Sequence, residues 1–429
     1  MKIINLTQLT PADYKALCQR PTLETKTLYS KVQAIIDDVK LRGDNAVRDY
    51  TKQFDGVALE DCTVSQAEFE QASTTVSVET QQALTIASAN ITAFHQAQAK
   101  PTLQVETMPG IVCSRQARAI ATVGLYIPGG TAPLVSTVLM LAIPARLAGC
   151  REIILCSPPD ATGHINPNIL YAAQLSGVTK VYKVGGTQAI AALAYGTATI
   201  PKVDKVFGPG NQYVMAAKSL VSIDPAGAAN DLPAGPSEVF VVADASARPD
   251  FVAADALSQA EHGTDSQATV VCGSQSQAEQ IQAEIDRQLA QLPRRDIAAA
   301  ALSHSAIVIA DSITSALQFA NDYAPEHLIL NVLKAEQYCD QIQNAGSVFL
   351  GPWSPESAGD YASGTNHTLP TNGLARSYGG VSLDSFVKYI TFQTLTEQAA
   401  RQLGPTVTTL AELEGLEAHK RAMLIRYQS

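Results

Sequence analysis

The sequence lacks most features that mark secreted, membrane-embedded or disulfide-stabilised proteins. Its seven cysteines are scattered and none form a Cys-x-x-Cys pair, so neither a disulfide framework nor a thiolate zinc site is indicated. The longest apolar stretch, residues 135–145, is interrupted by Ser136, Thr137 and Pro144 and is too short to span a bilayer. The first residues contain no apolar signal-peptide segment. A reducing, cytoplasmic location fits this pattern best.

Positive charge is also scarce. Thirty Lys and Arg residues stand against 40 Asp and Glu residues, which gives a formal net charge of -10. Binding to phosphate backbones or to anionic lipids requires a basic surface, so neither nucleic acid nor a membrane is expected as a partner. A hydrophobic fraction of 46% with 16% charged residues is typical of a globular protein, and 429 residues suffice for two or three cores.

The spacing of apolar residues along the chain predicts an α/β fold. The chain to about residue 100 has a mostly helical pattern, and Thr10-Pro11 is a typical helix start. From about residue 120, short β-branched runs alternate with helical patterns, which predicts parallel sheets covered by helices. The last fifty residues are expected to be helical, ending in a helix over about 410–426. Strands are predicted in two series, at 153–156, 181–184 and 203–207, and at 239–242, 269–272, 306–309, 328–330 and 348–350.

Two groups of polar residues near predicted element ends are candidates for chemistry. Gln259 and His262 are spaced i, i+3, so both lie on one helix face and can bind the same ligand. Taken alone, the pair favours a plainer explanation, in which a histidine before Gly263 is a cap that interacts favourably with the helix dipole. Glu326 and His327 precede a predicted strand, and a carboxylate beside an imidazole supplies two bases of different strength. A solvated loop pair explains them as well.

A metal site can be assembled from dispersed residues. Asp360 lies in a Gly/Ser/Thr-rich segment, 351–380, where it is either a turn former or part of a functional loop. His419 lies on the final predicted helix and would otherwise be a surface residue. Together with Gln259 and His262 they form an N₂O₂ donor set that zinc, manganese or cobalt would accept. The spacing alone leaves this grouping a hypothesis.

The sequence has no Gly-x-Gly-x-x-Gly fingerprint for a dinucleotide. Instead, glycines occur at Gly129-Gly130, at Gly185-Gly186 and around Pro209, the last two directly after predicted strands. Each allows a diphosphate to approach the N–H groups of a helix N-terminus, and each is equally explained as a plain strand-to-helix turn. Three in succession predict a binding edge at the carboxyl ends of the strands.

Seven strings, in order along the chain, resemble the histidinol dehydrogenase family. The resemblance extends from about residue 20 to residue 429, with no departure at a position that the family uses. The strings are GLYIPGG at 124–130, KVGGTQ at 183–188, FGPGN at 207–211, LPAGPSE at 232–238, SQAEHG at 258–263, PEHL at 325–328 and SPESAGDYASGTNH at 354–367.

The resemblance implies a particular architecture. It consists of two incomplete Rossmann-like domains with parallel sheets, plus small helical N- and C-terminal segments that intertwine in a homodimer. The expected divisions are an N-terminal helical segment (1–21), a first discontinuous α/β domain (22–125 and 237–376), a second, NAD-binding α/β domain (126–236) and a C-terminal helical dimerisation segment (377–429).

The resemblance also implies the reaction: oxidation of L-histidinol to L-histidine through L-histidinaldehyde, the last steps of histidine biosynthesis, with NAD⁺ and one Zn²⁺ per subunit. The implied general bases are Glu326 and His327, and the NAD contacts are Tyr126, Gln188 and Asn211. The implied zinc ligands are Gln259, His262, Asp360 and, from the second subunit, His419. The implied substrate contacts are Ser237, His327 and Glu414 together with those four ligands.

The chemistry of the candidate residues agrees with this reaction. Histidinol carries an imidazole and an amine, both of them donors for an electrophilic zinc that would anchor and orient the substrate. His327 is expected to accept the alcohol proton and Glu326 to activate water for the aldehyde step. Two rival interpretations are a zinc hydrolase, which has no need of NAD contacts, and a non-enzymatic binding protein, which gives no reason for Glu326 beside His327.

Overall fold

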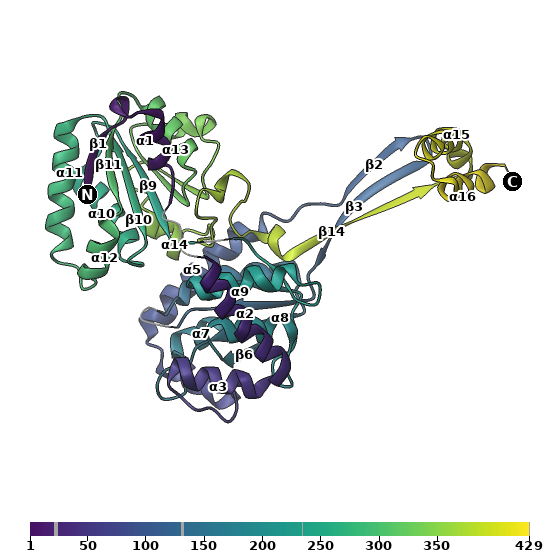
Figure 1. Cartoon of the computed structure of the whole chain (residues 1–429), viewed down its shortest axis with the longest axis horizontal. Coiled ribbons are helices and arrows are strands. Elements are labelled where there is room, and N and C mark those ends of the chain that lie inside the picture. The colour runs from purple at the N-terminus through teal and green to yellow at the C-terminus, as the bar shows by residue number, and fades with distance from the viewer. Residues whose placement is uncertain (21–24, 130–132, 234, 429) are drawn as a thin grey trace.

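The structure, a computed structural model, describes residues 1–20, 25–129, 133–233 and 235–428. Two parallel sheets form the two lobes seen in Figure 1, and a small antiparallel sheet forms an arm that extends away from them. The predicted α/β class is therefore correct, but the antiparallel sheet is an addition to it. Among the helices of these residues, none is long and apolar enough to cross a membrane.

The first lobe is built on a six-stranded sheet in which all neighbours run parallel. The second predicted strand series is found here, as β9 to β13. Helices α10 (Pro249–Ala260), α11 (Gln275–Leu289) and α12 (Arg295–Leu302) cover one face, and α1 (Pro11–Leu17) and α13 (Ile313–Tyr323) cover the other. The strand order is β1 (Lys2–Asn5), β11 (Ala306–Ile309), β10 (Gln267–Cys272), β9 (Glu238–Ala243), β12 (His327–Asn331) and β13 (Ser347–Leu350).

The second lobe is built on a five-stranded parallel sheet, which contains the first predicted strand series. Its order is β6 (Lys180–Lys183), β5 (Glu152–Ser157), β4 (Thr122–Tyr126), β7 (Lys205–Phe207) and β8 (Ala229–Asn230). One face is covered by α4 (Gln66–Thr75), α5 (Val78–Gln96), α6 (Val135–Ala148) and α7 (Pro167–Ser176). The other is covered by α2 (Thr25–Arg42), α3 (Asp44–Asp55), α8 (Gly186–Tyr195) and α9 (Gln212–Ile223).

This packing groups the N-terminal part of the chain differently from the boundaries expected above. Val32, Ile36 and Val39 of α2 are buried in the same core as α8 and α9, so the helices of residues 25–96 belong with the five-stranded sheet. Residues 1–21, expected to be a helical segment, contain strand β1, which pairs in parallel with β11. Helix α2 packs against α8 and α9 because its apolar face must be covered by another apolar surface.

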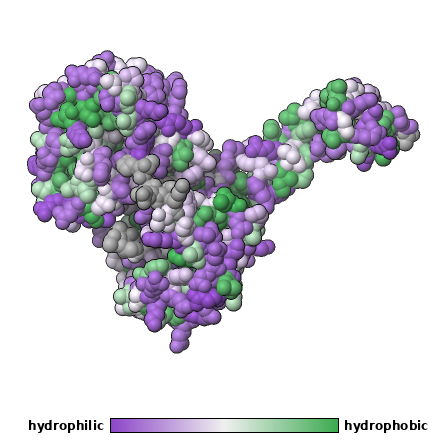
Figure 2. All heavy atoms as spheres, in the orientation of Figure 1, coloured by the Kyte–Doolittle hydropathy of each residue, from purple (hydrophilic) through white to green (hydrophobic). Residues whose placement is uncertain are grey.

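The arm consists of β2 (Leu103–Met108), β3 (Ile111–Ala119) and β14 (Val387–Leu395), with α15 (Glu397–Leu413) and α16 (Glu417–Tyr427) at its tip (Figure 1). The expectation that the last fifty residues are helical is wrong for β14 and right for the final helix. Both faces of β14 are largely exposed, so the strand has no alternation of buried and exposed residues. Apolar residues are exposed along the arm (Figure 2), namely Leu103, Val105, Ile390, Phe392, Leu395, Leu410, Leu413, Leu416 and Ile425.

Candidate active site

A cavity of about 150 Å³ lies where the two lobes meet. On one side its lining residues follow the carboxyl ends of β7 and β8, and on the other they stand at the amino ends of β9 and β12. The carboxyl edge of the five-stranded sheet, where a binding edge was expected, therefore lines the cavity. The six-stranded sheet instead contributes its amino edge.

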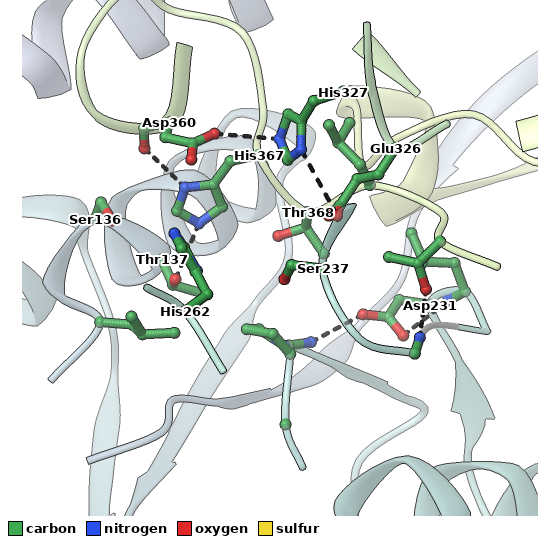
Figure 3. Close-up of a pocket in the computed structure, with 18 of the residues that line it drawn as sticks. Ser136, Thr137, Asp231, Ser237, His262, Glu326, His327, Asp360, His367 and Thr368 are labelled. Atoms are coloured by element: carbon green, nitrogen blue, oxygen red, sulfur yellow. Dashed lines mark hydrogen bonds and ion pairs between the residues drawn. The ribbon is translucent and has the colours of Figure 1, made fainter. Parts of the chain in front are cut away.

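Six of the expected site residues line this one cavity: Ser237, Gln259, His262, Glu326, His327 and Asp360. Figure 3 shows five of them by label, surrounding the same space. They come from the start of β9, the end of α10, the start of β12 and the short helix α14 (Glu356–Tyr361). Residues up to 123 positions apart in the chain, from Ser237 to Asp360, thus meet at one place.

Glu326 and His327 are both buried and are held by the backbone of the same residue. The N–H of Glu238 donates to Glu326 Oε2 at 2.9 Å, and its carbonyl oxygen lies 3.2 Å from His327 Nδ1. Burial raises the pKa of Glu326 to about 8. Burial alone would lower the pKa of His327, but the carboxylates of Glu356, Glu326 and Asp360 raise it above its usual value. Both groups therefore hold a proton more tightly than they would in water, which makes each a stronger base than usual.

Asp360 connects two of the three histidines that line the cavity, His327 and His367 (Figure 3). Its Oδ1 lies 3.4 Å from His327 Nε2, and its backbone oxygen lies 2.7 Å from Nδ1 of His367, whose Nε2 is 2.9 Å from Thr137 Oγ1. Burial opposes ionisation of Asp360, but the neighbouring His327 outweighs it and lowers the pKa of the carboxyl. Asp360 is thus an anion at neutral pH.

Glu356 is a site residue that the sequence analysis missed. It is 1% exposed, and burial raises its pKa to about 8. With its amide oriented to satisfy both neighbours, Gln259 donates to Glu356 Oε1 and accepts from the Glu238 N–H at 3.2 Å. Glu356 and Asp360 are spaced i, i+4 on α14, so they share a helix face. That spacing was visible in the sequence, within a segment expected to be a loop.

Two overlapping groups of potential metal ligands are present. His327, Glu356 and Asp360 offer ligand atoms that all lie within 4.8 Å of one another. The expected group, Gln259, His262 and Asp360, lines the same cavity and shares Asp360 with the first. Burial lowers the pKa of His262, which keeps its imidazole in the neutral form that binds metals.

Glu414 and His419 do not reach this cavity within the chain. Both are exposed, Glu414 at the end of α15 and His419 on α16, at the tip of the arm that Figure 1 shows directed away from both lobes.

The expected NAD contacts cluster at the carboxyl edge of the five-stranded sheet. Tyr126 ends β4, and its hydroxyl accepts from the N–H of Gly186 at 3.1 Å. Gln188 is 1% exposed, and neither of its amide atoms has a hydrogen-bond partner among the described residues. Asn211 caps α9 and lines a groove of about 1060 Å³ that opens beside the cavity and shares Ser237 with it. Gly130 lies outside the described residues.

Comparison with known proteins identifies this arrangement. The model of the family described as histidinol dehydrogenase matches residues 18–427. The chain belongs to the histidinol dehydrogenase family. A histidinol dehydrogenase of Bacteroides thetaiotaomicron is 54% identical over 96% of this chain and 95% of its own length. The chloroplastic histidinol dehydrogenase of Oryza sativa subsp. japonica is 52% identical over 100% of this chain and 90% of its own length.

A solved structure supports the same assignment. The crystal structure of histidinol dehydrogenase from Elizabethkingia anophelis has a TM-score of 0.96 and 51% identity, covering 100% of this chain and 98% of that one. A proline utilization A (PutA) structure aligns with a TM-score of 0.52 at 12% identity over 90% of this chain and 43% of that one, which is a likeness of fold alone. As a histidinol dehydrogenase, the protein acts in the final step of histidine biosynthesis.

The loop that precedes Asn211 in this histidinol dehydrogenase is held by a buried ion pair that the sequence analysis also missed. Lys218 Nζ lies 2.5 Å from Asp231 Oδ1 and donates to the Gly208 carbonyl at 2.7 Å. The Gly208 N–H in turn donates to Asp231 Oδ2 at 2.9 Å. Gly208 has φ of 121°, and any side chain there would collide with the backbone oxygen of Tyr126. Glycine is therefore required at this position.

Proposed function

We propose that this histidinol dehydrogenase oxidises L-histidinol through L-histidinaldehyde to L-histidine with NAD⁺ and one Zn²⁺ per subunit. The observation that carries the proposal is that the three candidate zinc ligands, Gln259, His262 and Asp360, line one cavity. The two candidate general bases, Glu326 and His327, line the same cavity. The cavity opens beside a groove lined by Asn211, large enough for a dinucleotide.

The residues of the cavity fit a divalent cation. Three carboxyl groups, Glu326, Glu356 and Asp360, are buried around it, and Oε2 of Glu356 has no hydrogen-bond partner among the described residues. Such a concentration of buried acidic oxygens beside neutral imidazole is stabilised by a positive ion. Gln259, His262 and Asp360 would hold the zinc, which would supply a Lewis acid that binds the substrate's nitrogen donors.

The chain's own groups account for the proton transfers. Nδ1–H of His327 is directed to the Glu238 carbonyl, and its Nε2 faces Asp360 across the cavity. In the neutral imidazole, Nε2 would accept the alcohol proton as hydride moves to the nicotinamide. Glu326, with a pKa of about 8, is a stronger base than an ordinary carboxylate and would remove a proton from the water that hydrates the aldehyde. A second hydride transfer from the hydrate then yields the carboxylate.

The substrate site is proposed to be completed by a second copy of the chain. Ser237 lines the cavity, whereas Glu414 and His419 stand exposed on the arm. The arm also exposes a series of apolar side chains, which is typical of a surface that another protein covers. A homodimer in which each arm reaches the other subunit's cavity would bring Glu414 and His419 to substrate and zinc.

The stoichiometry of NADH production tests the reaction. We expect two NADH per L-histidinol consumed, loss of activity after chelation, and recovery when Zn²⁺ is restored. One NADH per substrate would contradict the four-electron oxidation, and full activity in metal-free enzyme would contradict the zinc. Hydrolysis of an added ester with no NADH would favour a zinc hydrolase, and histidinol binding without NAD⁺ reduction would favour a binding protein.

Mixed dimers test the contribution of the arm. Glu326→Gln and His419→Asn should each reduce activity strongly as pure dimers. If the arm acts across the dimer, a mixed dimer has one intact site and about half of the wild-type activity. If the arm acts within its own chain, the mixed dimer has no intact site and stays inactive.

We also propose a cytoplasmic location. All seven cysteines of the chain are free, which suits a reducing compartment. Fractionation of cells, with the native protein detected by antibody, tests this location.

A further inference from the structure

Arg20 is a largely buried cation to which the reaction proposed above assigns no role, although it lines the groove proposed for the dinucleotide. Its side chain is 10% exposed, and its Nε donates to Glu238 Oε2 at 2.6 Å. Its Nη1 donates to the carbonyls of Cys18 at 2.9 Å and of Tyr323 at 2.8 Å. The guanidinium also stacks over the ring of Tyr323, 3.5 Å from its centroid. Arg20 is therefore fixed by contacts on several sides.

Glu238, the partner of Arg20, is the residue whose backbone holds the proposed acid–base groups. Its side chain is 2% exposed, while its N–H donates to Glu326 and its carbonyl accepts from His327. The same N–H is 3.2 Å from the amide oxygen of Gln259. One peptide segment thus contacts three of the residues that line the cavity.

Because the side chain of Glu238 is held in place, the position of its backbone is restricted as well. Glu238 begins β9, a strand whose six residues are all buried, and lies one residue before Val239, which pairs with His327 of β12. A buried carboxylate is costly unless it is paired, so the location of Arg20 restricts where the first residue of β9 can lie. The guanidinium fork fixes direction as well as distance, because its donors are rigid and planar.

We propose that Arg20 and Glu238 form a positioning pair for the acid–base groups of the active site. Arg20 holds the Glu238 side chain, and the Glu238 backbone then sets where the Glu326 carboxylate and the His327 ring stand relative to substrate. Arg20 itself acts through Glu238. The inference rests on the roles proposed for Glu326 and His327.

The test compares Arg20→Met, Arg20→Lys and Glu238→Gln in the zinc-loaded, full-length enzyme. Arg20→Met should lower kcat for histidinol oxidation at least tenfold and change KM for histidinol and for NAD⁺ less than threefold. Arg20→Lys restores a positive charge beside Glu238 and should recover kcat to within about threefold of wild type. Glu238→Gln keeps the backbone donor and acceptor and the side-chain size, and should lower kcat as Arg20→Met does.

Tyr14→Phe is the matched control. It removes the 2.7 Å hydrogen bond from Tyr14 to Asp322, which also ties the N-terminal segment to α13, but it leaves Glu238 and its partners intact. We expect wild-type kcat from this variant. Zinc content and thermal unfolding are measured for every variant, so that loss of metal or of fold is separated from loss of rate; if Arg20→Met does not fold, Glu238→Gln provides the rate test.

Two results would overturn the proposal: kcat within twofold of wild type in folded, zinc-loaded Arg20→Met or Glu238→Gln, or equal losses in Arg20→Lys and Arg20→Met. A decrease in kcat in Tyr14→Phe as large as that in Arg20→Met would also overturn the proposal. Loosening of the N-terminal segment would then be enough to explain the lower rate of Arg20→Met. Failure of the proposed function is recognised separately, since Glu326→Gln and His327→Asn would then retain the wild-type rate.

Discussion

Replacing Lys218 by methionine should destabilise the protein by about 3–5 kcal/mol, the range for breaking a buried ion pair from one side. Lys218 and Asp231 are each 1% exposed and lie 2.5 Å apart. Methionine fills similar space but leaves the Asp231 carboxylate, among the described residues, with the backbone N–H donors of Gly208 and Leu232. The Gly208 carbonyl also loses its bond from Lys218.

The same change should affect cofactor binding more than substrate binding. Gly208 begins the loop that leads to Asn211, so loosening it should raise KM for NAD⁺ more than KM for histidinol. The free energy of unfolding is measured by urea denaturation at one fixed protein concentration, because dimer stability depends on concentration. Initial rates at varied NAD⁺ provide the second readout.

Two further variants separate the buried ion pair from an ordinary surface pair. Lys180→Met removes an exposed pair with Glu152, 3.7 Å long, and should cost less than about 1 kcal/mol. Lys218→Met combined with Asp231→Leu removes both buried charges and should recover most of the lost stability. A cost below about 1 kcal/mol for Lys218→Met alone, or no recovery in the double variant, would refute the account of this ion pair.

Four other outcomes are expected. His327→Asn should slow the first oxidation by about 10²–10⁴-fold in single-turnover assays, because it removes the proton acceptor. Glu326→Gln should impair oxidation of L-histidinaldehyde more than that of L-histidinol, measured with each substrate separately. His262→Asn should lose zinc, measured by elemental analysis. Asp255→Asn, on α10, should stabilise the protein above neutral pH by up to about 4 kcal/mol, because burial raises the pKa of Asp255 from 3.8 to about 7 and each unit corresponds to about 1.4 kcal/mol.

The pH dependence of the last variant has a definite sign. A carboxyl whose folded-state pKa is raised binds its proton more tightly in the folded chain, so wild-type stability falls as pH rises from about 4 to about 7. The advantage of Asp255→Asn should therefore be absent near pH 4, grow across that window and be constant above it. An advantage independent of pH would contradict this origin. Equal rates on alcohol and aldehyde in Glu326→Gln, wild-type rates in His327→Asn, or full zinc in His262→Asn would contradict the other three.

The sequence predicted the central strands well, because their residues are buried on both faces and form continuous apolar runs such as 239–242 and 328–330. Strand β1 was missed, since four residues that pair with β11 some 300 positions away carry no local signal. The arm was missed because β14 is exposed on both faces and has no periodicity of burial. Its partner, β3, is likewise distant in sequence, and β3 in turn pairs with β2 on its other side.

In the candidate site, too, pairs of residues close in sequence could be predicted, whereas contacts between residues far apart in sequence could not. Gln259 and His262 could be paired from helical spacing, but their meeting with Asp360 was implied by the family resemblance and not by any spacing. Glu356 was overlooked because its helix lies in a Gly/Ser-rich segment expected to be a loop. Arg20 and Glu238 lie 218 positions apart, so their ion pair required the fold.

The most direct test of the central claim is the position of zinc in crystals of the enzyme, located by anomalous diffraction at the zinc absorption edge. We expect a single peak per cavity within coordination distance of Gln259, His262 and Asp360, with His419 of a second copy of the chain beside it. A peak bound by His327 and Glu356 with Gln259 and His262 unbound would contradict it, as would the absence of zinc from crystals of fully active enzyme.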